Sequence, residues 1–264
     1  MRLRRLAISA AACLSLLASA GTVSATDLAA HRAMYKLKLE SSKGGDVTAA
    51  SGTMAYEVQD ACDGWATRQR LQMTLTNRDG QDIQMLSDYT TWESKDGLKL
   101  RFRMKQTTDQ AVTSDVAGEA SLAGTGEAGK AQFTTPEAST KDLPRGTLFP
   151  MMHTAALLRG AAEGKKFLAL PLFDGTSAAG AQDSSIVISH WTHDPVGAWP
   201  ELKGLASGKF HIAFFDRGPQ GQEPDYEVSM RYWDNGVADD LNMDFGDFVM
   251  AGKMAEFKLL PGKC

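Results

Sequence analysis

Apolar and polar residues alternate with a period of two along most of the chain. The alternation is clearest at 35–39, 98–105 and 226–232, where apolar side chains occupy every second position. Successive side chains of a β-strand point to opposite faces of a sheet, so this pattern predicts strands with one face toward a core. Turn sequences such as Asn235-Gly236 favour antiparallel pairing of neighbouring strands. The chain is therefore predicted to be mainly β.

One segment departs from this pattern and predicts a helix. Pro150 suits a first helical turn because its fixed φ and missing N–H are tolerated there, and Gly164 suits the left-handed position that ends a helix. Residues placed about 100° apart put the polar His153, Arg159 and Glu163 opposite an apolar arc. The predicted core face of the helix consists of Met151, Thr154, Ala155, Leu157, Leu158, Ala161 and Ala162.

The stretch 143–175, which contains this helix, has two interpretations. It is either an element that contacts a ligand or a plug that fills the core, and the plug is favoured because an apolar arc must be covered. Almost every other segment reads as a strand. The predicted fold is an antiparallel open barrel or β-spiral wrapped around one central helix.

The N-terminal segment has the three parts of a signal peptide. Basic residues precede an apolar run at 6–17, and small residues lead up to Ala25, with Ala20 as a second cleavage position. The run is too short to span a bilayer, so a retained membrane helix is the weaker interpretation. We expect export to the periplasm, removal of residues 1–25, and a single domain at 26–264 with no transmembrane segment.

The charge of the mature chain argues against one class of partner. Removing the three arginines of the leader from the 28 cationic residues leaves 25 against 32 acidic residues, which moves the formal charge from −4 to −7. An acidic protein without a basic block is a poor candidate for binding the phosphates of nucleic acid. No nucleic-acid partner is therefore predicted.

Two cysteines remain after the leader is removed. Cys62 and Cys264 lie near opposite ends of the mature chain. An even pair in an oxidising compartment favours one disulfide, while a pair of free thiols and a metal site are the alternatives. A metal site is the weaker of these because no histidines cluster with the two cysteines.

Candidate chemistry is sparse. His190, His193 and Asp194 could together bind zinc or relay protons, but residues three apart on a strand point to opposite faces, which argues against convergence. No nucleophile elbow, paired Cys–His arrangement or phosphate-binding glycine loop is present in the sequence. The sequence therefore predicts no catalytic residue, no metal site and no cofactor, although catalytic groups can also assemble in space.

Several short motifs carry a resemblance to a known family. They are spread in order over almost the whole mature chain: His31-Arg32-Ala33, Ser51-Gly52 with Tyr56 before Cys62, Gly146-Thr147-Leu148-Phe149-Pro150, His153-Thr154, Phe173-Asp174-Gly175, Asp244-Phe245-Gly246-Asp247-Phe248 and Cys264. On these motifs the chain resembles the EipB-like cell envelope integrity family of exported proteins of Gram-negative bacteria.

The resemblance implies a fold, a location and a role. It implies a periplasmic, non-enzymatic β-spiral with a buried helix, closed by a disulfide between Cys62 and Cys264. It also implies a role in maintaining the envelope and some architectural likeness to carriers that bring lipoproteins to the outer membrane. Phe245 stands where the family pattern has tyrosine.

Three functions then compete. The first is support of the envelope by binding an envelope protein, with 109–140 as the exposed sheet edge and a helical-repeat scaffold as one partner. The second is a lipid or lipoprotein carrier, which needs an apolar cavity lined by Met, Phe and Leu. The third is an envelope hydrolase, which needs a carboxylate pair or a Ser–His pair in a cleft. We expect the first.

Overall fold

The computed structural model describes residues 28–193, 199–218 and 223–262, which form one antiparallel sheet of 14 strands and one α-helix. The predicted mainly β fold is confirmed. The strands are β1 (His31–Ser42), β2 (Val47–Asp60), β3 (Gly64–Asn77), β4 (Asp82–Ser94), β5 (Lys99–Thr108), β6 (Ala111–Leu122), β7 (Gly129–Thr135), β8 (Ser139–Leu143), β9 (Phe167–Leu172), β10 (Gln182–Thr192), β11 (Ser207–Asp216), β12 (Tyr226–Trp233), β13 (Ala238–Asp244) and β14 (Phe248–Leu259). The α-helix is α1 (Pro150–Ala162), and a short 3-10 helix spans Pro200–Leu202.

The order of the strands places the first and last of them in the middle of the sheet. The order is β8-β7-β6-β5-β4-β3-β2-β1-β14-β13-β12-β11-β10-β9. Strand β1 pairs with β14 from His31↔Leu259 onward, with two register shifts along the pairing. Such irregularities bend a sheet locally. The two free edges, β8 and β9, are therefore consecutive in sequence and are joined through α1.

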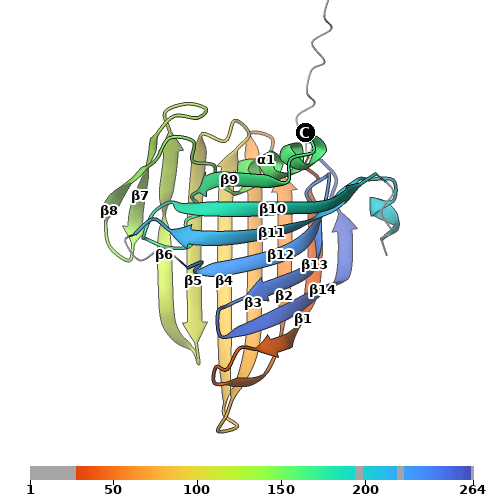
Figure 1. Cartoon of the computed structure of the whole chain (residues 1–264). Coiled ribbons are helices and arrows are strands. Elements are labelled where there is room, and N and C mark those ends of the chain that lie inside the picture. Colours follow the sequence, from red (N-terminus) through yellow and green to blue (C-terminus); the bar gives the residue numbers. More distant parts are fainter. Residues whose placement is uncertain (1–27, 194–198, 219–222, 263–264) are drawn as a thin grey trace, which may run out of the picture.

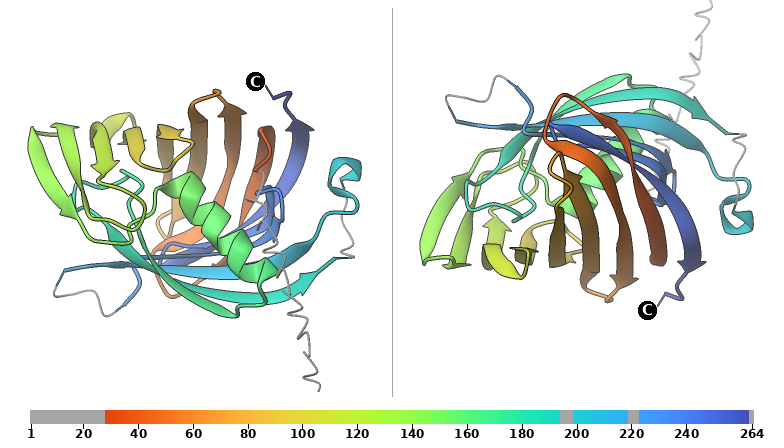
Figure 2. Two further views of the ribbon diagram at one scale, coloured as in Figure 1. Left: turned by 90° about the horizontal axis from the view of Figure 1, so that it is seen from above. Right: turned by 90° about the horizontal axis from the view of Figure 1, so that it is seen from below.

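The sheet curls into two walls that face each other. In Figure 1 the strands β2–β6 run along one wall, and β9–β13 run across them in front. Seen from above and below in Figure 2, α1 lies across the opening between the walls. This is the open spiral around a helix that the alternating pattern and the single helical segment predict.

The predicted position of the sheet edge is wrong. The segment 109–140 contains β6 and β7, and each of these strands pairs with a neighbour on both sides. The edge strand is β8, of which the segment contains only the first two residues, Ser139 and Thr140. Small residues along 109–140 suggested an edge, but several of them, such as Ala120 and Ala131, are buried in strands that are paired on both sides.

The second edge, β9, is partly covered by the segment that leads into α1. The N–H of Leu148 donates to Pro171 O at 2.9 Å, and the N–H of Phe173 donates to Leu148 O at 3.0 Å. The ring of Phe173 then packs edge-on against Phe102 and Phe133 of the opposite wall. These contacts close the spiral next to the helix.

Helix α1 begins at Pro150 and ends before Gly164, which has a positive φ of 77°. The side chains of Met151, Ala155, Leu157, Leu158 and Ala161 are buried, and Thr154 is half-buried.

Two positions of the predicted helix pattern are wrong. Ala162 is exposed because the last turn of the helix is covered on the side of Gly160 and Ala161, which are buried, and not on the side of Ala162, so it does not belong to the core face. His153, expected on the polar arc, is buried because it reaches Ser184 of β10. The sheet therefore covers α1 on more than one side.

Two other predictions fall on residues outside the described ranges. The signal peptide at 1–25 is one of them. Cys264 is the other, so its pairing with Cys62, which lies in the turn between β2 and β3, stays a prediction. Across the residues that are described, no helix is long and apolar enough to cross a membrane.

Candidate functional site

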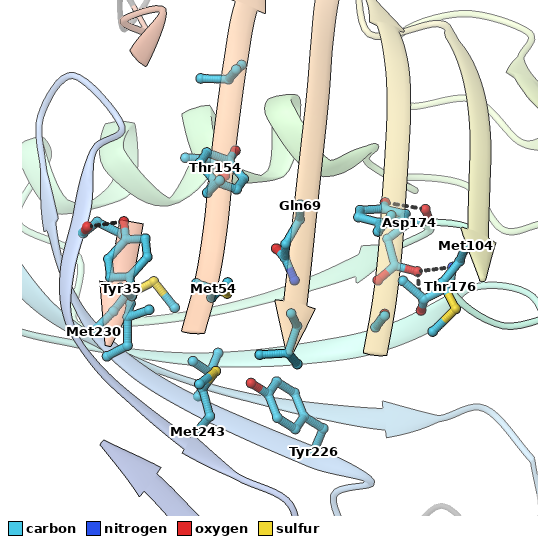
Figure 3. Close-up of a pocket in the computed structure, with 18 of the residues that line it drawn as sticks. Tyr35, Met54, Gln69, Met104, Thr154, Asp174, Thr176, Tyr226, Met230 and Met243 are labelled. Atoms are coloured by element: carbon cyan, nitrogen blue, oxygen red, sulfur yellow. Dashed lines mark hydrogen bonds between the residues drawn. The ribbon is translucent and has the colours of Figure 1, made fainter. Parts of the chain in front are cut away.

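A cavity of about 670 Å³ lies between the two walls, beside α1. Its lining comes from inward positions of β1–β5 and β11–β13, from α1, and from the loop between β9 and β10. Figure 3 shows these side chains converging from both walls and from the helix. The volume lies within the range of pockets that enclose small organic ligands. The helix therefore fills only part of the space inside the spiral.

Methionines supply much of the apolar lining. Their unbranched thioether side chains adapt to differently shaped apolar ligands, which is why such residues are frequent on adaptable binding surfaces. Leucine, valine and phenylalanine side chains complete the apolar surface. The methionines that line the cavity are Met54, Met73, Met85, Met104, Met151, Met230 and Met243.

All five tyrosines of the chain line this cavity. The hydroxyl of Tyr35 donates to Ala238 O at 2.6 Å, and that of Tyr89 donates to Asp174 O at 2.5 Å. Burial raises the pKa of every one of these phenols, so all remain neutral at physiological pH. The rings of Tyr35 and Tyr89 thus line the cavity while backbone carbonyl groups hold their hydroxyls.

Asp174 is the carboxylate of the cavity. It follows β9 in the Phe173-Asp174-Gly175 motif, and the N–H and hydroxyl of Thr176 donate to its Oδ1 at 2.9 and 2.8 Å. Burial raises its pKa, while the bonds from Thr176 act in the opposite direction. The sequence analysis noted the motif but assigned it no role.

The N-terminus of α1 is held by a carboxylate from the opposite wall. Phe149 occupies the position before the helix and offers no side-chain cap. Glu93 of β4 takes this role, because Oε2 accepts the N–H of Met151 at 2.7 Å and Oε1 accepts that of Met152 at 2.9 Å. Free N–H groups at a helix start favour such an anion.

The buried environment of Glu93 disfavours the charged form of its carboxyl group. Burial raises its pKa to about 7, with the two helix N–H groups lowering it in part. The sequence analysis missed this residue. One signal was available in the sequence. Glu93 follows Tyr89 by an even number of residues, so both side chains point to the same inward face of the strand. Glu93 is therefore a charged residue at a core position.

A serine and a histidine do meet in the structure, as the hydrolase hypothesis requires. His153 Nε2 lies 2.8 Å from Ser184 Oγ, and that hydroxyl donates to Leu170 O at 2.7 Å. The imidazole must then donate to Ser184, so it does not act as its base. Both residues are buried, neither lines the cavity, and burial lowers the pKa of His153 to about 4. This pair tethers α1 to β9 and β10.

The two histidines of the candidate zinc or proton-relay cluster do not converge on a pocket. His190, at an irregularity of β10 with a positive φ of 55°, is exposed, and so is His193. Asp194 lies outside the described residues. Within the described ranges, no group of three or more His, Cys, Asp or Glu side chains is placed to hold a metal ion.

Comparison with known proteins identifies the family. The family described as EipB-like matches residues 22–261. The chain belongs to the EipB-like family. A curated relative, the "Cell envelope integrity protein EipB" of Brucella abortus, is 32% identical over 258 residues, covering 91% of this chain and 88% of the relative.

A solved structure supports the same assignment. The crystal structure of a beta-barrel-like protein with a domain of unknown function from Brucella abortus matches with a TM-score of 0.80 and 28% identity. The match covers 89% of this chain and 99% of that one. This EipB-like chain therefore shares its fold with a solved beta-barrel-like protein, and the resemblance noted from the sequence motifs is confirmed.

Phe245, where the resemblance led us to expect tyrosine, belongs to the cavity. Phe245 is among the lining residues, and its ring lies 5.4 Å from that of Tyr226 and 5.1 Å from that of Phe248. An EipB-like chain with phenylalanine here has a more apolar lining at this point than one with tyrosine.

Proposed function

We propose that the protein supports the integrity of the cell envelope from the periplasm by binding, without chemical turnover, the apolar part of an envelope lipid or lipoprotein. The observation that carries this proposal is the cavity between the walls, which α1 leaves open. An apolar cavity is the feature that a lipid or lipoprotein carrier needs. The name of the curated relative supports the envelope role.

The lining suits acyl chains better than rigid polar ligands. Methionine, leucine and phenylalanine side chains exclude water. The tyrosine rings add apolar area, and the hydroxyls of Tyr35 and Tyr89 stay bonded to the protein. Removing an acyl chain from water contributes about 0.8 kcal/mol for each buried CH₂ group. A medium-length chain would therefore gain enough to bind reversibly.

A matched pair of substitutions tests the proposal. Met230 lines the cavity and is half-buried, whereas Met34 is half-buried on the same sheet but does not line it. Met230→Trp should fill the cavity, and Met34→Trp should leave it open. The readouts are titration with the neutral apolar dye N-phenyl-1-naphthylamine and mass spectrometry of lipids extracted from protein purified from the periplasm.

The expected result is binding by the wild type and by Met34→Trp, with loss of binding in Met230→Trp. Cells that lack the gene should be sensitive to detergent. The wild-type gene and the Met34→Trp variant should restore detergent resistance, and Met230→Trp should not. Absence of dye binding and of extractable lipid in the wild type, or full activity of a folded Met230→Trp variant, would overturn the proposal.

A second candidate function is the binding of an envelope protein. The observation that favours it is β8, which pairs only with β7 among the described residues and leaves its other side free for an added strand. The exposed Thr140, Lys141 and Asp142 belong to this edge. Cavity binding and edge pairing use different surfaces, so one does not exclude the other.

A further inference from the structure

Carboxyl, amide and hydroxyl side chains gather at one end of the cavity, which we call the polar end. Register places Gln69, Tyr89 and Met104 side by side across β3, β4 and β5, and Asp174 and Thr176 of the next loop face the same region. Ser87 and Gln106 form the adjacent pair on β4 and β5, and Gln182 begins β10.

The other end lies toward the meeting of β1, β2, β12 and β13. Figure 3 shows Tyr35 and Met230 there, with Met54 and Met243 between that end and the Asp174 end. A stretch lined by methionines therefore leads to the cluster of hydroxyl, amide and carboxyl groups around Asp174, while tyrosines also line its far end. A ligand that matches it has an apolar tail and a polar head.

The sign of charge at the polar end is set by one residue. None of the described residues that line the cavity is lysine or arginine. His31, the one lining histidine, bonds through Nδ1 to Ala29 O at 2.8 Å, and burial lowers its pKa, which keeps it neutral near pH 7. Among the described lining residues, Asp174 is thus the side chain that can supply a charge, and this charge is negative.

The carboxylate of Asp174 is oriented before any ligand arrives. Thr176 donates twice to Oδ1, and the hydroxyl of Tyr89 fixes the backbone through the carbonyl of Asp174. In Figure 3 the second carboxylate oxygen turns toward the interior of the cavity. An acceptor held in this way suits a donor on the ligand, because little freedom remains to be lost on binding.

We propose that Asp174 receives the cationic ammonium head of an amphiphile whose acyl or alkyl chain lies along the methionine-lined stretch of the cavity; this rests on the proposed function. A buried carboxylate is costly without a counter-charge, and a bound cation supplies one. An anionic head would meet Asp174 without any lining cation to balance it. Tyrosine rings add to this preference because cations bind to aromatic faces.

Three amphiphiles with the same chain and different heads test the assignment. Dodecylammonium, dodecanoate and dodecyl maltoside are titrated into the mature full-length protein by calorimetry, below their micellar concentrations. Dodecylammonium should bind more tightly than dodecanoate by about 10- to 100-fold, which is the range expected for one hydrogen bond to a charged group. The neutral maltoside should bind with intermediate affinity.

The test variant is Asp174→Asn, which keeps an oxygen for Thr176 but loses the charge. The matched control is Asp183→Asn, since Asp183 is exposed at the start of β10, pairs with Arg217, and does not line the cavity. Asp174→Asn should remove the preference for dodecylammonium while dodecyl maltoside still binds. Asp183→Asn should retain the preference.

Two failures are distinguishable. If none of the three amphiphiles binds the wild type, the proposed cavity function itself is overturned, and this inference falls with it. If all three bind equally, if dodecanoate binds most tightly, or if Asp174→Asn keeps the preference for the cation, the role of Asp174 is overturned while the cavity function stands.

Discussion

At the residue scale, Gly175 shows how closely the loop beside Asp174 approaches the opposite wall. Its φ is +75°, and a Cβ at this position would lie 2.2 Å from Cγ of Phe102. We expect Gly175→Ala to lower the free energy of unfolding by about 2–4 kcal/mol, because both backbone strain and the contact with the ring must be accommodated. Denaturant unfolding measures this.

Gly164→Ala is the control for that substitution. Gly164 has nearly the same φ of +77°, but nothing lies within 4 Å of the Cβ that would be added. It should cost only about 1–2 kcal/mol, the price of the left-handed conformation alone. Equal losses of unfolding free energy in the two variants would show that the Phe102 ring can move aside at no cost, and would contradict a steric contribution at Gly175.

Two buried groups next to the helix should give opposite pH dependences. The pKa of Glu93 is raised to about 7 in the folded protein, so the folded state binds more protons than the unfolded state from about pH 4.5 to 7, and stability falls as pH rises. The pKa of His153 is lowered to about 4, so between about pH 4 and 6.5 the unfolded state binds more protons, and stability falls as pH falls.

Substitution separates these two effects. Relative to Glu93→Gln, the stability of the wild type should decrease by about 3 kcal/mol from pH 4.5 to 7. Relative to His153→Gln, it should increase by about 3 kcal/mol from pH 4 to 6.5. Urea unfolding at intervals of half a pH unit measures both. A difference that stays flat with pH in either comparison would contradict the burial that shifts that group.

Individual site residues were the part of the molecule least predictable from sequence. Asp174 stood in a noted motif but without a role, and Glu93 and the tyrosines carried no signal beyond their strand parity. Their importance comes from long-range contacts, such as that between Glu93 and the start of α1, 58 residues away. Local patterns do not encode such contacts.

At the element scale, α1 was predictable because its signals are local. Pro150 and Gly164 mark its ends, and the period of its apolar residues marks its principal buried face. What the pattern could not reveal is a second covered side, where His153 reaches β10. Ala162 was misplaced because the pattern does not show which side of the last turn is covered, and that side is the one of Gly160 and Ala161.

The packing of α1 predicts unequal effects for two adjacent residues. Leu158 is 1% exposed, whereas Arg159 is exposed on the same turn. Leu158→Ala should lower the free energy of unfolding by about 2–5 kcal/mol, depending on how far the surrounding core relaxes. Arg159→Ala should change it by about 0.5 kcal/mol or less. Thermal and urea unfolding of both variants test this, and similar losses would contradict a helix buried on the Leu158 side.

At the scale of the whole molecule, the alternating pattern predicted many strands but not their order. Hairpin turns indicate which neighbours in sequence pair, and 12 of the pairings follow this rule. The pairing of β1 with β14 joins the first and last strands of the described chain in the middle of the sheet and carries no local signal. The one predicted edge, 109–140, was misplaced for the same reason, because an edge is defined by the neighbour it lacks.

The correction of the edge moves the predicted protein-binding surface to β8. Along an extended strand, adjacent residues direct their N–H groups to opposite sides, so one of Thr140 and Lys141 points toward β7 and the other points away from it. Proline placed at the outward position removes a donor that an added strand would use, while the pairing with β7 is retained. Thermal unfolding of Thr140→Pro and Lys141→Pro identifies which of the two preserves the fold.

The variant that keeps its stability is then the informative one. If an envelope protein binds by adding a strand to β8, this variant should lose crosslinking to that protein in periplasm while it still binds the apolar dye, because the cavity is lined by other strands. Cells that carry it should then show the detergent sensitivity expected of the deletion. A fold-preserving variant that crosslinks and complements like the wild type would exclude β8 as the protein-binding edge and leave the cavity as the surface through which the protein acts.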